Sequence, residues 1–339
     1  MTNRSARNPA FMRAAFIRTL GGPDAIEYGH LPVPAPGPED VLLRMEAVAV
    51  NHVDLLIRSG AYATQLEFPF IVGRDVVGTV QAVGSDVRSL APGDRAWSNS
   101  LGHAGRQGSF SEFVLAAAER VYRLPAGVTA EKAVAVLHGG ATAYLGLVRE
   151  ACLIAGETVV ILGAGGAVGS AAVQIAVSLG ARVLAVAAGA DLGWVTGLGA
   201  QSVLDYREPQ LHRRLEELTD GGAEVAWDCS GSMKVNHLAT LLGVGGRIIH
   251  TAGIHARQDI DTGALYVRDI SLHGFAISNA SVADLDAAAT LLNALFAGRG
   301  IEARLGMILP LSAAARSHQL LEQGTRHGIG GKIVLIPTH

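Results

Sequence analysis

The stretch from Thr158 to Gly180 reads TVVILGAGGAVGSAAVQIAVSLG. Five apolar residues, a glycine-rich run and an apolar periodic segment predict a strand over 158–162, a tight turn and a helix over 168–179. In such a turn the N–H groups at a helix N-terminus face an anion, and small residues let the backbone approach a pyrophosphate. We therefore expect the turn to bind a dinucleotide through Ala164, Gly165, Gly166, Ala167, Val168 and Gly169.

Strands and helices continue to alternate after this turn. The pattern predicts strands over 182–187, 202–204, 225–227 and 247–250, and helices over 211–218 and 235–242. Successive strand–helix–strand units of this kind form a doubly wound parallel sheet, so the fold class is α/β. Ligands of such sheets bind beyond the carboxyl ends of the strands. We assign to the cofactor site the residues that follow those ends: Ala188, Gly189, Tyr206, Ser230, Gly231, Thr251, Ala252 and Gly253.

Both ends of the chain have a different pattern. Residues 13–136 contain short apolar runs interrupted by Gly, Pro and Asp, which predicts strands with turns and no helices. A helix is expected over 129–149. Beyond residue 271 we expect a strand, a helix over 282–297, a strand near Met307, a helix over 313–323 and a final strand over 332–336.

The bulk composition narrows the class of protein. A chain of 339 residues predicts two domains. The net charge is −3 and no block of like charges occurs, so we expect no nucleic-acid partner, no membrane partner and a small-molecule substrate. Two cysteines are too few for a disulfide framework, which favours a cytoplasmic location. Residues 1–11 are interpreted as a loose tail without a signal peptide.

The dinucleotide is expected to be NADPH, with NADH possible. An acidic residue at the end of the second strand grips the ribose hydroxyls in NAD sites, and Ala187, Ala188 and Gly189 stand there instead. Tyr206 and the neighbouring Arg207 are placed to stack on adenine and to pair with a 2′-phosphate. Asp191 leaves the preference open, because its carboxylate would repel that phosphate or bind the ribose of NAD.

Several motifs in a fixed order resemble one family. They are FIRTLGGPDAIEY near the start, NHVDLLIRSGAY from Asn51, GRDVVGTVQAVGSDV from Gly73, APGDRAW from Ala91, GSFSEFV from Gly108, GATAYLGL from Gly140, the glycine turn, and GGRII from Gly245. The chain resembles the medium-chain dehydrogenases/reductases, in the zinc-independent quinone oxidoreductase (zeta-crystallin-like) branch with its enoyl-reductase relatives. The resemblance covers residues 12–337.

This resemblance implies a fold, a cofactor set and a reaction. A GroES-like β-rich catalytic domain would comprise residues 1–137 and 276–339, and a Rossmann domain residues 138–275. Thr142 and Phe275 would join the cofactor site. The protein would be a homodimer that uses NADPH to reduce a quinone or the activated C=C bond of an enone or enoyl thioester. Two alternatives stay open: a zinc-free alcohol or ketone oxidoreductase, and an NADPH-binding protein of low turnover.

The resemblance also identifies where zinc-dependent relatives hold their metal. Those positions here are Asn51, Arg74 and His138. A catalytic zinc needs three protein ligands and an open position, so we expect no metal, and His138 to be a packed histidine.

Reduction of a conjugated C=C bond needs a proton for the α carbon. Enoyl-reductase relatives assign this proton to the tyrosine of a G-x-Y motif, which Gly60, Ala61 and Tyr62 match. Tyr62 is our catalytic candidate, the alternative being a tyrosine that packs at the mouth of the cleft. We also place Asn51 in the catalytic site, as a hydrogen-bonding group for substrate or cofactor, and expect Asp54 to fix its loop. Leu56 departs from quinone oxidoreductases, which often carry tyrosine there.

Overall fold

The computed structural model describes residues 9–324 and 330–338, so the predicted tail lies outside it as far as residue 8. The chain divides into two compact units: unit 1 is residues 1–138 with 304–339, and unit 2 is residues 139–303. Helix α2 (Ala130–Tyr144) carries the chain from the first unit to the second. Within the described ranges, no helix has both the length and the apolarity that crossing a membrane requires.

Unit 1 is built mainly of antiparallel strands. Its described residues form two sheets, with orders β2-β1-β4 and β15-β16-β3-β5-β6-β8, and β7 also pairs with β3. The strands are β1 (Phe11–Ile17), β2 (Glu27–Pro32), β3 (Asp40–Ala49), β4 (Phe70–Ile71), β5 (Val76–Val83), β6 (Arg95–Ser98), β7 (Phe113–Ala117), β8 (Tyr122–Arg123), β15 (Leu305–Pro310) and β16 (Lys332–Ile336). The C-terminal strand joins the N-terminal sheet, because Val334 of β16 pairs with Ala49 of β3.

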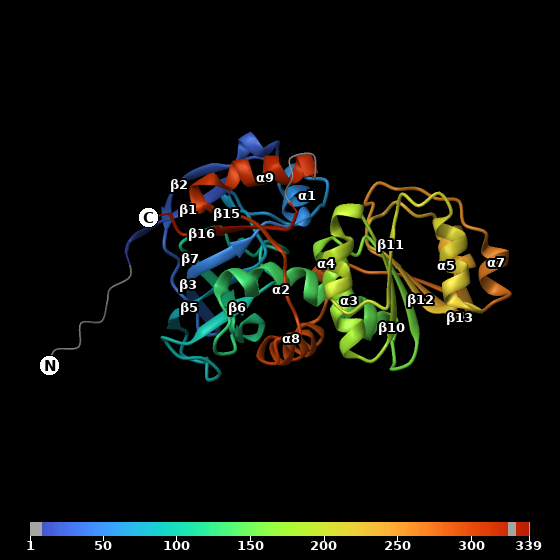
Figure 1. Ribbon diagram of the computed structural model, residues 1–339. Helices are drawn as coiled ribbons and strands as arrows, with labels where there is room; N and C mark the ends of the chain where they lie inside the picture. Colours follow the sequence, from blue (N-terminus) through green and yellow to red (C-terminus); the bar gives the residue numbers. More distant parts are fainter. Residues whose placement is uncertain (1–8, 325–329, 339) are drawn as a thin grey trace. The chain divides into compact units, whose positions relative to one another are not determined.

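Helix α1 (His52–Ser59) corrects the prediction that residues 13–136 contain no helix. The Asp54 carboxylate accepts the backbone N–H of Asn51 at 2.8 Å, which satisfies a donor at the start of the helix. Gly60 ends the helix in the left-handed region at φ 83°, a conformation that favours glycine. Eight residues are too few for a periodic apolar pattern to stand out, whereas the caps were readable. Helix α9 (Ala314–Gln323) lies beside α1 (Figure 1).

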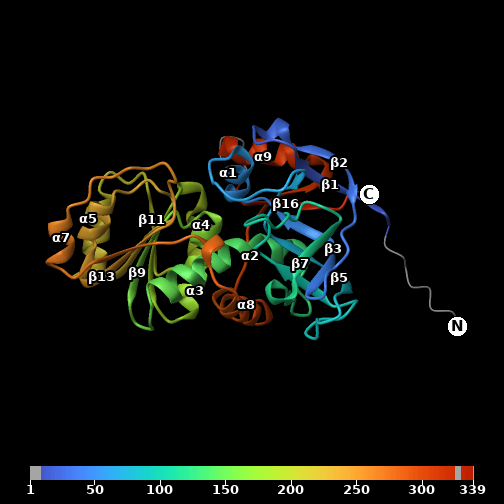
Figure 2. The same ribbon diagram turned by 180° about the vertical axis from the view of Figure 1, so that it is seen from behind.

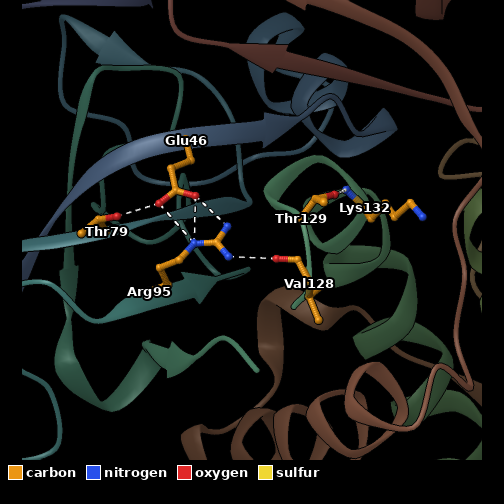
Figure 3. A network of polar contacts seen from close by, with 6 residues as sticks. All are labelled: Glu46, Thr79, Arg95, Val128, Thr129 and Lys132. Carbon is orange, nitrogen blue, oxygen red and sulfur yellow. Dashed lines mark hydrogen bonds and ion pairs between the residues drawn. The ribbon is translucent and has the colours of Figure 1, made fainter. Parts of the chain in front are cut away.

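Hydrogen bonds connect three strands of unit 1 to one another and to Val128, which lies just before α2 (Figure 3). Glu46 of β3 accepts Thr79 Oγ1 of β5 at 2.6 Å and Arg95 Nη2 of β6 at 2.7 Å. Arg95 Nη1 also donates to the carbonyl of Val128 at 2.9 Å. Burial alone would raise the pKa of Glu46, but the hydrogen bonds from Arg95 and Thr79 hold it below its ordinary value. The carboxylate therefore stays ionised and connects β3 to β5 and β6.

Unit 2 is the predicted doubly wound domain. Its six strands are parallel, in the order β11-β10-β9-β12-β13-β14. They are β9 (Thr158–Leu162), β10 (Arg182–Ala187), β11 (Ser202–Asp205), β12 (Ala223–Asp228), β13 (Leu242–His250) and β14 (Ser271–Gly274). Helices α3 (Ala167–Ser178) and α4 (Leu192–Gly197) lie on one face of the sheet, and α5 (Leu211–Thr219) and α7 (Thr262–Tyr266) on the other (Figures 1 and 2).

The remaining helices of unit 2 are α6 (Val235–Thr240) and α8 (Val282–Ala297), the latter with the predicted bounds. Within this unit, α8 is held by an ion pair of 3.1 Å between Asp284 and Arg149. Our sequence-based boundaries give residues 276–303 to the catalytic domain and remain a prediction, whereas in the structure these residues group with unit 2.

Candidate functional site

The glycine turn lies where the sequence places it, between β9 and α3 in unit 2. Strand β9 ends at Leu162 and helix α3 begins at Ala167, with Gly166 as its extended N-cap residue. A Cβ atom on Gly169 would lie 2.2 Å from the Gly163 carbonyl oxygen, so the first turn of the helix packs directly on the backbone. The first N–H groups of a helix have no acceptor within it, and here they adjoin a turn free of bulky side chains. This arrangement fits a pyrophosphate.

Residues after β12 and β13 lie along the same edge of the sheet. The strand order reverses between β9 and β12, the point at which doubly wound sheets bind their ligand. A Cβ on Gly163 would lie 3.0 Å from the Ser230 nitrogen, and one on Gly231 would lie 3.0 Å from the Ala252 Cβ. Three predicted segments, the turn, 230–231 and 251–253, are therefore brought together.

The ends of β10 and β11 form the next part of this edge. Tyr206 donates its backbone N–H to the carbonyl of Ala187 at 3.0 Å. A Cβ on Gly189 would lie 2.7 Å from Asp205 Oδ2. The Tyr206 side chain is 53% exposed, and the Arg207 guanidinium lies 5.2 Å from its ring centroid. An aromatic face and a cation thus stand together beyond the strand ends.

Asp191 lies against the glycine turn itself. A Cβ on Gly165 would lie 2.6 Å from Asp191 Oδ2, so the carboxylate is beside the segment expected to face the phosphates. Its negative charge opposes an extra phosphate group at this edge of the sheet.

Two predicted cofactor residues, Thr251 and Phe275, contact the indole of Trp227. Trp227 Nε1 donates to Thr251 Oγ1 at 3.0 Å, and the ring of Phe275 lies 6.2 Å from the Trp227 ring. Thr142 is buried on α2, three residues after Gly139, where a Cβ would lie 2.8 Å from the Ala167 carbonyl oxygen. Thr142 is therefore on the helix that passes the start of α3, whereas Thr251 and Phe275 pack against Trp227.

Cys229 follows β12 at the same edge but does not have the character of a reactive thiol. Burial, and then the charge of Asp228, raise the pKa of the Cys229 thiol above its ordinary value. A thiolate is therefore disfavoured there.

Unit 1 contains a second group of predicted residues, centred on Asn51. Asn51 is 2% exposed, and its Nδ2 donates to Asp75 Oδ2 at 3.0 Å. Its Oδ1 accepts the ammonium of Lys332, which comes from the first residue of β16. The Asn51 amide therefore bonds to protein groups, and its predicted bond to substrate or cofactor stays a prediction.

Two buried carboxylates flank Asn51. Burial raises the pKa of Asp75 to about 7 and that of Asp54 to about 6. The Oδ1 atoms of both are buried without a hydrogen-bond partner. Lys332 and Arg74 stabilise the charged forms only in part. Both carboxyl groups therefore gain or lose their protons near neutral pH.

Arg74 is the fully buried cation of this group. It is 0% exposed, and burial lowers the pKa of its guanidinium, while Asp54, Asp75 and Tyr62 favour its charge. Its Nε, Nη1 and Nη2 atoms are all buried and have no hydrogen-bond partner. Because a guanidinium keeps its proton in proteins, a charged group with unused donors remains in the interior.

His138 completes the set. Its Nδ1 lies 4.0 Å from Asp75 Oδ1, and burial, Arg74 and Lys332 hold its pKa well below the ordinary value. His138 is thus a neutral imidazole.

Tyr62 reaches this group from the loop after α1. Its ring meets His103 edge-on at 5.9 Å, and its backbone N–H donates to the Leu56 carbonyl at 3.0 Å. Thr64 Oγ1 lies 3.0 Å from His103 Nδ1. Tyr62 is partly buried and acts on the charge of Arg74, so the predicted tyrosine and the buried guanidinium are neighbours.

The donor set at the predicted metal positions does not fit zinc. Arg74 contributes a cation that repels a metal, and the amide of Asn51 bonds to Asp75 and Lys332. In the part of the chain that the structure describes, no group of three or more His, Cys, Asp or Glu side chains is arranged to hold a metal ion.

Sequence reasoning missed two members of this group. Asp75 directly follows Arg74. Two charged residues just before the buried strand β5 are the sequence signal that could have identified Asp75 as a member of the group. Lys332 contacts Asn51 across 281 residues of sequence, and no local pattern announces such a contact.

A parallel sheet with a glycine turn at its switch point, joined to a β-rich unit with a buried polar group, defines a nicotinamide-dependent oxidoreductase. Residues 37–126 match the family described as "Alcohol dehydrogenase GroES-like domain", and residues 167–294 match "Zinc-binding dehydrogenase". The quinone oxidoreductase of Lama guanicoe is 31% identical over 98% of this chain and 99% of that protein.

Solved structures agree with this assignment. A structure titled as an NAD-dependent alcohol dehydrogenase has a TM-score of 0.86 and 31% identity, and covers 96% of this chain and 100% of its own. A mycobacterial protein complexed with NADPH has a TM-score of 0.82 and 28% identity, with the same coverage of both chains. The chain belongs to the medium-chain dehydrogenase/reductase superfamily, and its relatives include quinone oxidoreductases. It is an NAD(P)H-dependent oxidoreductase.

Proposed function

We propose that this protein uses NADPH to reduce a quinone or the activated C=C bond of an enone or enoyl thioester, without zinc. The observation that carries the proposal is Arg74, a buried cation at a position where zinc-dependent relatives hold their metal. A conjugated acceptor needs a hydride, a donor for its oxygen and a proton, and none of these requires a metal. Bound reduced nicotinamide supplies the hydride.

The test is a panel of acceptors. Oxidation of NADPH and NADH is followed by absorbance with quinones, enones, enoyl-CoA esters and simple ketones. We expect turnover with a conjugated acceptor and none with simple ketones, and a chelator should leave the rate unchanged. Stoichiometric zinc in the active protein, lost together with activity, would overturn the proposal.

A second candidate function is a zinc-free alcohol or ketone oxidoreductase. It is favoured by the likeness to the NAD-dependent alcohol dehydrogenase structure. The same panel separates the two, because this candidate reduces simple ketones and oxidises alcohols. An absence of turnover with every acceptor would leave a dinucleotide-binding protein of low turnover as the remaining alternative.

The proposed proton donor is Tyr62, which lies beside Arg74 and His103. Tyr62→Phe removes the hydroxyl and keeps the ring. With an enone we expect the rate to fall by about 100-fold, the usual contribution of one positioned acid. Quinone reduction should change much less, because oxygen atoms exchange protons with water readily. An unchanged enone rate would remove Tyr62 from this role.

NADPH is preferred in this proposal because Tyr206 and Arg207 present a ring and a cation beyond β11. Arg207→Ala should weaken NADPH and spare NADH. Asp191, beside Gly165, opposes the extra phosphate, so Asp191→Asn should strengthen NADPH binding. Dissociation constants for both cofactors measure this. Tighter binding of NADH by the unmodified protein, together with no effect of Arg207→Ala, would reverse the preference.

We also propose a homodimer and a cytoplasmic location. Strand β14 lies at one edge of the unit 2 sheet, and Tyr266, Val267 and Leu272 around it are exposed apolar side chains. Both cysteines are free thiols, in keeping with a reducing compartment. Light scattering measures the mass, and a monomer at micromolar concentration would contradict the dimer.

A further inference from the structure

Trp227 is a fully buried indole near the carboxyl end of β12, at the edge of the unit 2 sheet where the predicted cofactor residues lie. The six-membered ring of the indole packs on the backbone of Gly146, where a Cβ atom would lie 2.6 Å from Trp227 Cζ3. Gly146 belongs to a π-helical segment (Leu145–Glu150) that continues α2, and Phe275 follows β14. The indole is therefore held between a helical segment and the end of a neighbouring strand.

The indole nitrogen fixes the hydrogen-bonding role of the Thr251 hydroxyl. Trp227 Nε1 donates to Thr251 Oγ1 at 3.0 Å. An indole N–H donates and cannot accept, so Thr251 has to be the acceptor and keeps its own hydroxyl hydrogen for another group. Within the residues that the structure describes, this bond is the one interaction of the Thr251 hydroxyl. The hydroxyl is therefore a donor without a protein acceptor.

Thr251 lies where a ligand can reach it. It directly follows β13 and is partly exposed. Residues 230–231, after β12, lie against the glycine turn, and β13 is one strand further from it, about 10 Å from β9 at the usual strand spacing. Tyr206 lies on the other side of the turn, after β11.

This position corresponds to one half of a dinucleotide. The pyrophosphate binds at the glycine turn, and the two nucleosides extend from it to opposite sides along the strand ends. With Tyr206 beside the adenine half, Thr251 is on the nicotinamide side, with a ribose between it and the turn. The carboxamide of nicotinamide has an acceptor oxygen and a donor nitrogen, and a hydroxyl that is left as a donor selects the oxygen.

We propose that Trp227 orients the Thr251 hydroxyl as a hydrogen-bond donor to the carboxamide oxygen of the bound nicotinamide. Thr251 contacts the cofactor, and Trp227 acts through Thr251 as a positioning residue. Such a bond holds the nicotinamide ring in one orientation, which hydride transfer requires. The inference rests on the proposed function for its dinucleotide, and every residue in it belongs to unit 2.

The first experiment compares ligands with and without the nicotinamide ring. Calorimetry gives dissociation constants for NADH and NADPH, and for ADP-ribose and its 2′-phosphate, which carry the same adenine half and no nicotinamide. Thr251→Val should weaken binding of the dinucleotides by about 5-fold, the usual net effect of one hydrogen bond. Binding of the ADP-ribose ligands should stay the same. An equal loss for both kinds of ligand, or no loss for either, would overturn the proposal.

Trp227→Phe tests whether the indole acts through Thr251. It removes the N–H group and keeps an aromatic ring, so the hydroxyl remains but is no longer oriented, and dinucleotide binding should weaken by about 3-fold. The double variant Trp227→Phe/Thr251→Val should bind the dinucleotides as Thr251→Val does, about 5-fold more weakly than the unmodified protein, and not about 15-fold more weakly. Two independent losses that multiply would remove Trp227 from the positioning role.

Two further variants serve as controls. Thr251→Ser keeps the hydroxyl and should restore binding close to that of the unmodified protein. Thr240→Val removes the same group just before β13 begins, at the opposite edge of the sheet, where Thr240 Oγ1 donates to the His237 carbonyl at 2.9 Å. This variant should bind all four ligands normally. A loss in Thr251→Ser as large as that in Thr251→Val would show that the hydroxyl is not the group that binds.

The second experiment observes the indole directly and does not need a Trp227 variant. The chain has three tryptophans, so the ¹H–¹⁵N spectrum contains three indole signals. Trp97→Phe and Trp194→Phe identify two of them, and the third belongs to Trp227. Thr251→Val should shift the Trp227 signal towards that of an indole without a hydrogen bond. In the unmodified protein, a dinucleotide should shift it and ADP-ribose should not. A Trp227 signal that is the same in Thr251→Val would contradict the bond on which the inference depends.

The acceptor panel of the proposed function distinguishes the possible failures. If no acceptor is reduced but Thr251→Val weakens binding of the dinucleotides alone, the proposed function is wrong and the role of Thr251 stands. If a conjugated acceptor is reduced and Thr251→Val binds every ligand normally, the function stands and the role of Thr251 is wrong.

Discussion

Among the described residues of unit 1, two arginine side chains are buried, Arg58 on α1 and Arg74 just before β5, and their surroundings differ. Arg58 donates to the Gly21 carbonyl at 3.1 Å and to Glu322 at 2.5 Å, and its Nη1 lies 3.4 Å from His318 Nδ1. Arg74 has no such partner on any nitrogen. The first arginine connects α1 to α9, whereas the second lies in the interior with its donors unused. Burial of a charge alone therefore does not show whether an arginine stabilises the fold, whereas its hydrogen bonds do.

The largest expected effect is on stability. Arg58→Met should lower the free energy of unfolding by about 3 kcal/mol, because it leaves the Gly21 carbonyl without its donor and Glu322 without its ion pair. Arg74→Met should leave this free energy unchanged or raise it by about 1 kcal/mol, since an unpaired buried charge is replaced by an apolar side chain. Urea unfolding of both variants at pH 6 is the measurement. Equal losses in the two variants would show that Arg74 is structural and would break the comparison.

A smaller effect on the free energy of unfolding is expected from pH. Its sign is opposite for Asp75, which interacts with Arg74, and for His318, which interacts with Arg58. Burial raises the pKa of Asp75 from 3.8 to about 7, so its contribution to stability is full below pH 4 and is lost as pH rises towards 7. Burial, with Arg58, lowers the pKa of His318 from 6.5 to about 3, so its contribution is full above pH 6.5 and is lost as pH falls.

Single variants separate the contributions of Asp75 and His318 to stability. Relative to the unmodified protein, Asp75→Asn should add a slope of about +1.4 kcal/mol per pH unit to the free energy of unfolding between pH 4 and 7. His318→Gln should add a slope of the same size and negative sign between pH 3 and 6.5. Denaturant midpoints across this range provide the slopes. Two slopes of the same sign would mean that folding shifts the pKa of Asp75 or of His318 in the opposite direction.

The smallest effect concerns the exposed end of the Arg58 site. Glu322 is 38% exposed, so Glu322→Gln should cost about 1 kcal/mol or less, because water screens the ion pair and takes over part of the bond. The loss should shrink further at high salt. A cost as large as that of Arg58→Met would place most of the stabilisation in this one pair instead of in the Gly21 bond.

Local patterns in the sequence predicted most of unit 2. Strand β9, strand β10 and helix α8 have the expected bounds, because each has a clear apolar period or a clear cap. The glycine turn was predicted for the same reason, since the strand, turn and helix are contiguous. Helix α1 was missed because it is short and stands among strands.

The polar group of unit 1 was only partly predictable. Asn51 and Tyr62 stand in motifs, and Arg74 occupies a position where zinc-dependent relatives hold their metal. None of these sequence signals indicates which hydrogen bonds a side chain makes. The contact of Lys332 with Asn51 depends on β16 pairing with β3, which is tertiary information. Burial and partner inventories exist only once the chain has folded.

The return of the C-terminal strand to the N-terminal sheet has a consequence for biosynthesis. A chain leaves the ribosome from its N-terminus, and domains fold as units when complete. Unit 2 is one continuous stretch and is complete at residue 303. Unit 1 is incomplete until β16 emerges. Before then, Val48 and Ala49 at the end of β3 lack β16 as a pairing partner, and Asn51 lacks Lys332. The nascent protein therefore completes unit 2 first, and the Asn51–Lys332 contact forms only after β16 has emerged.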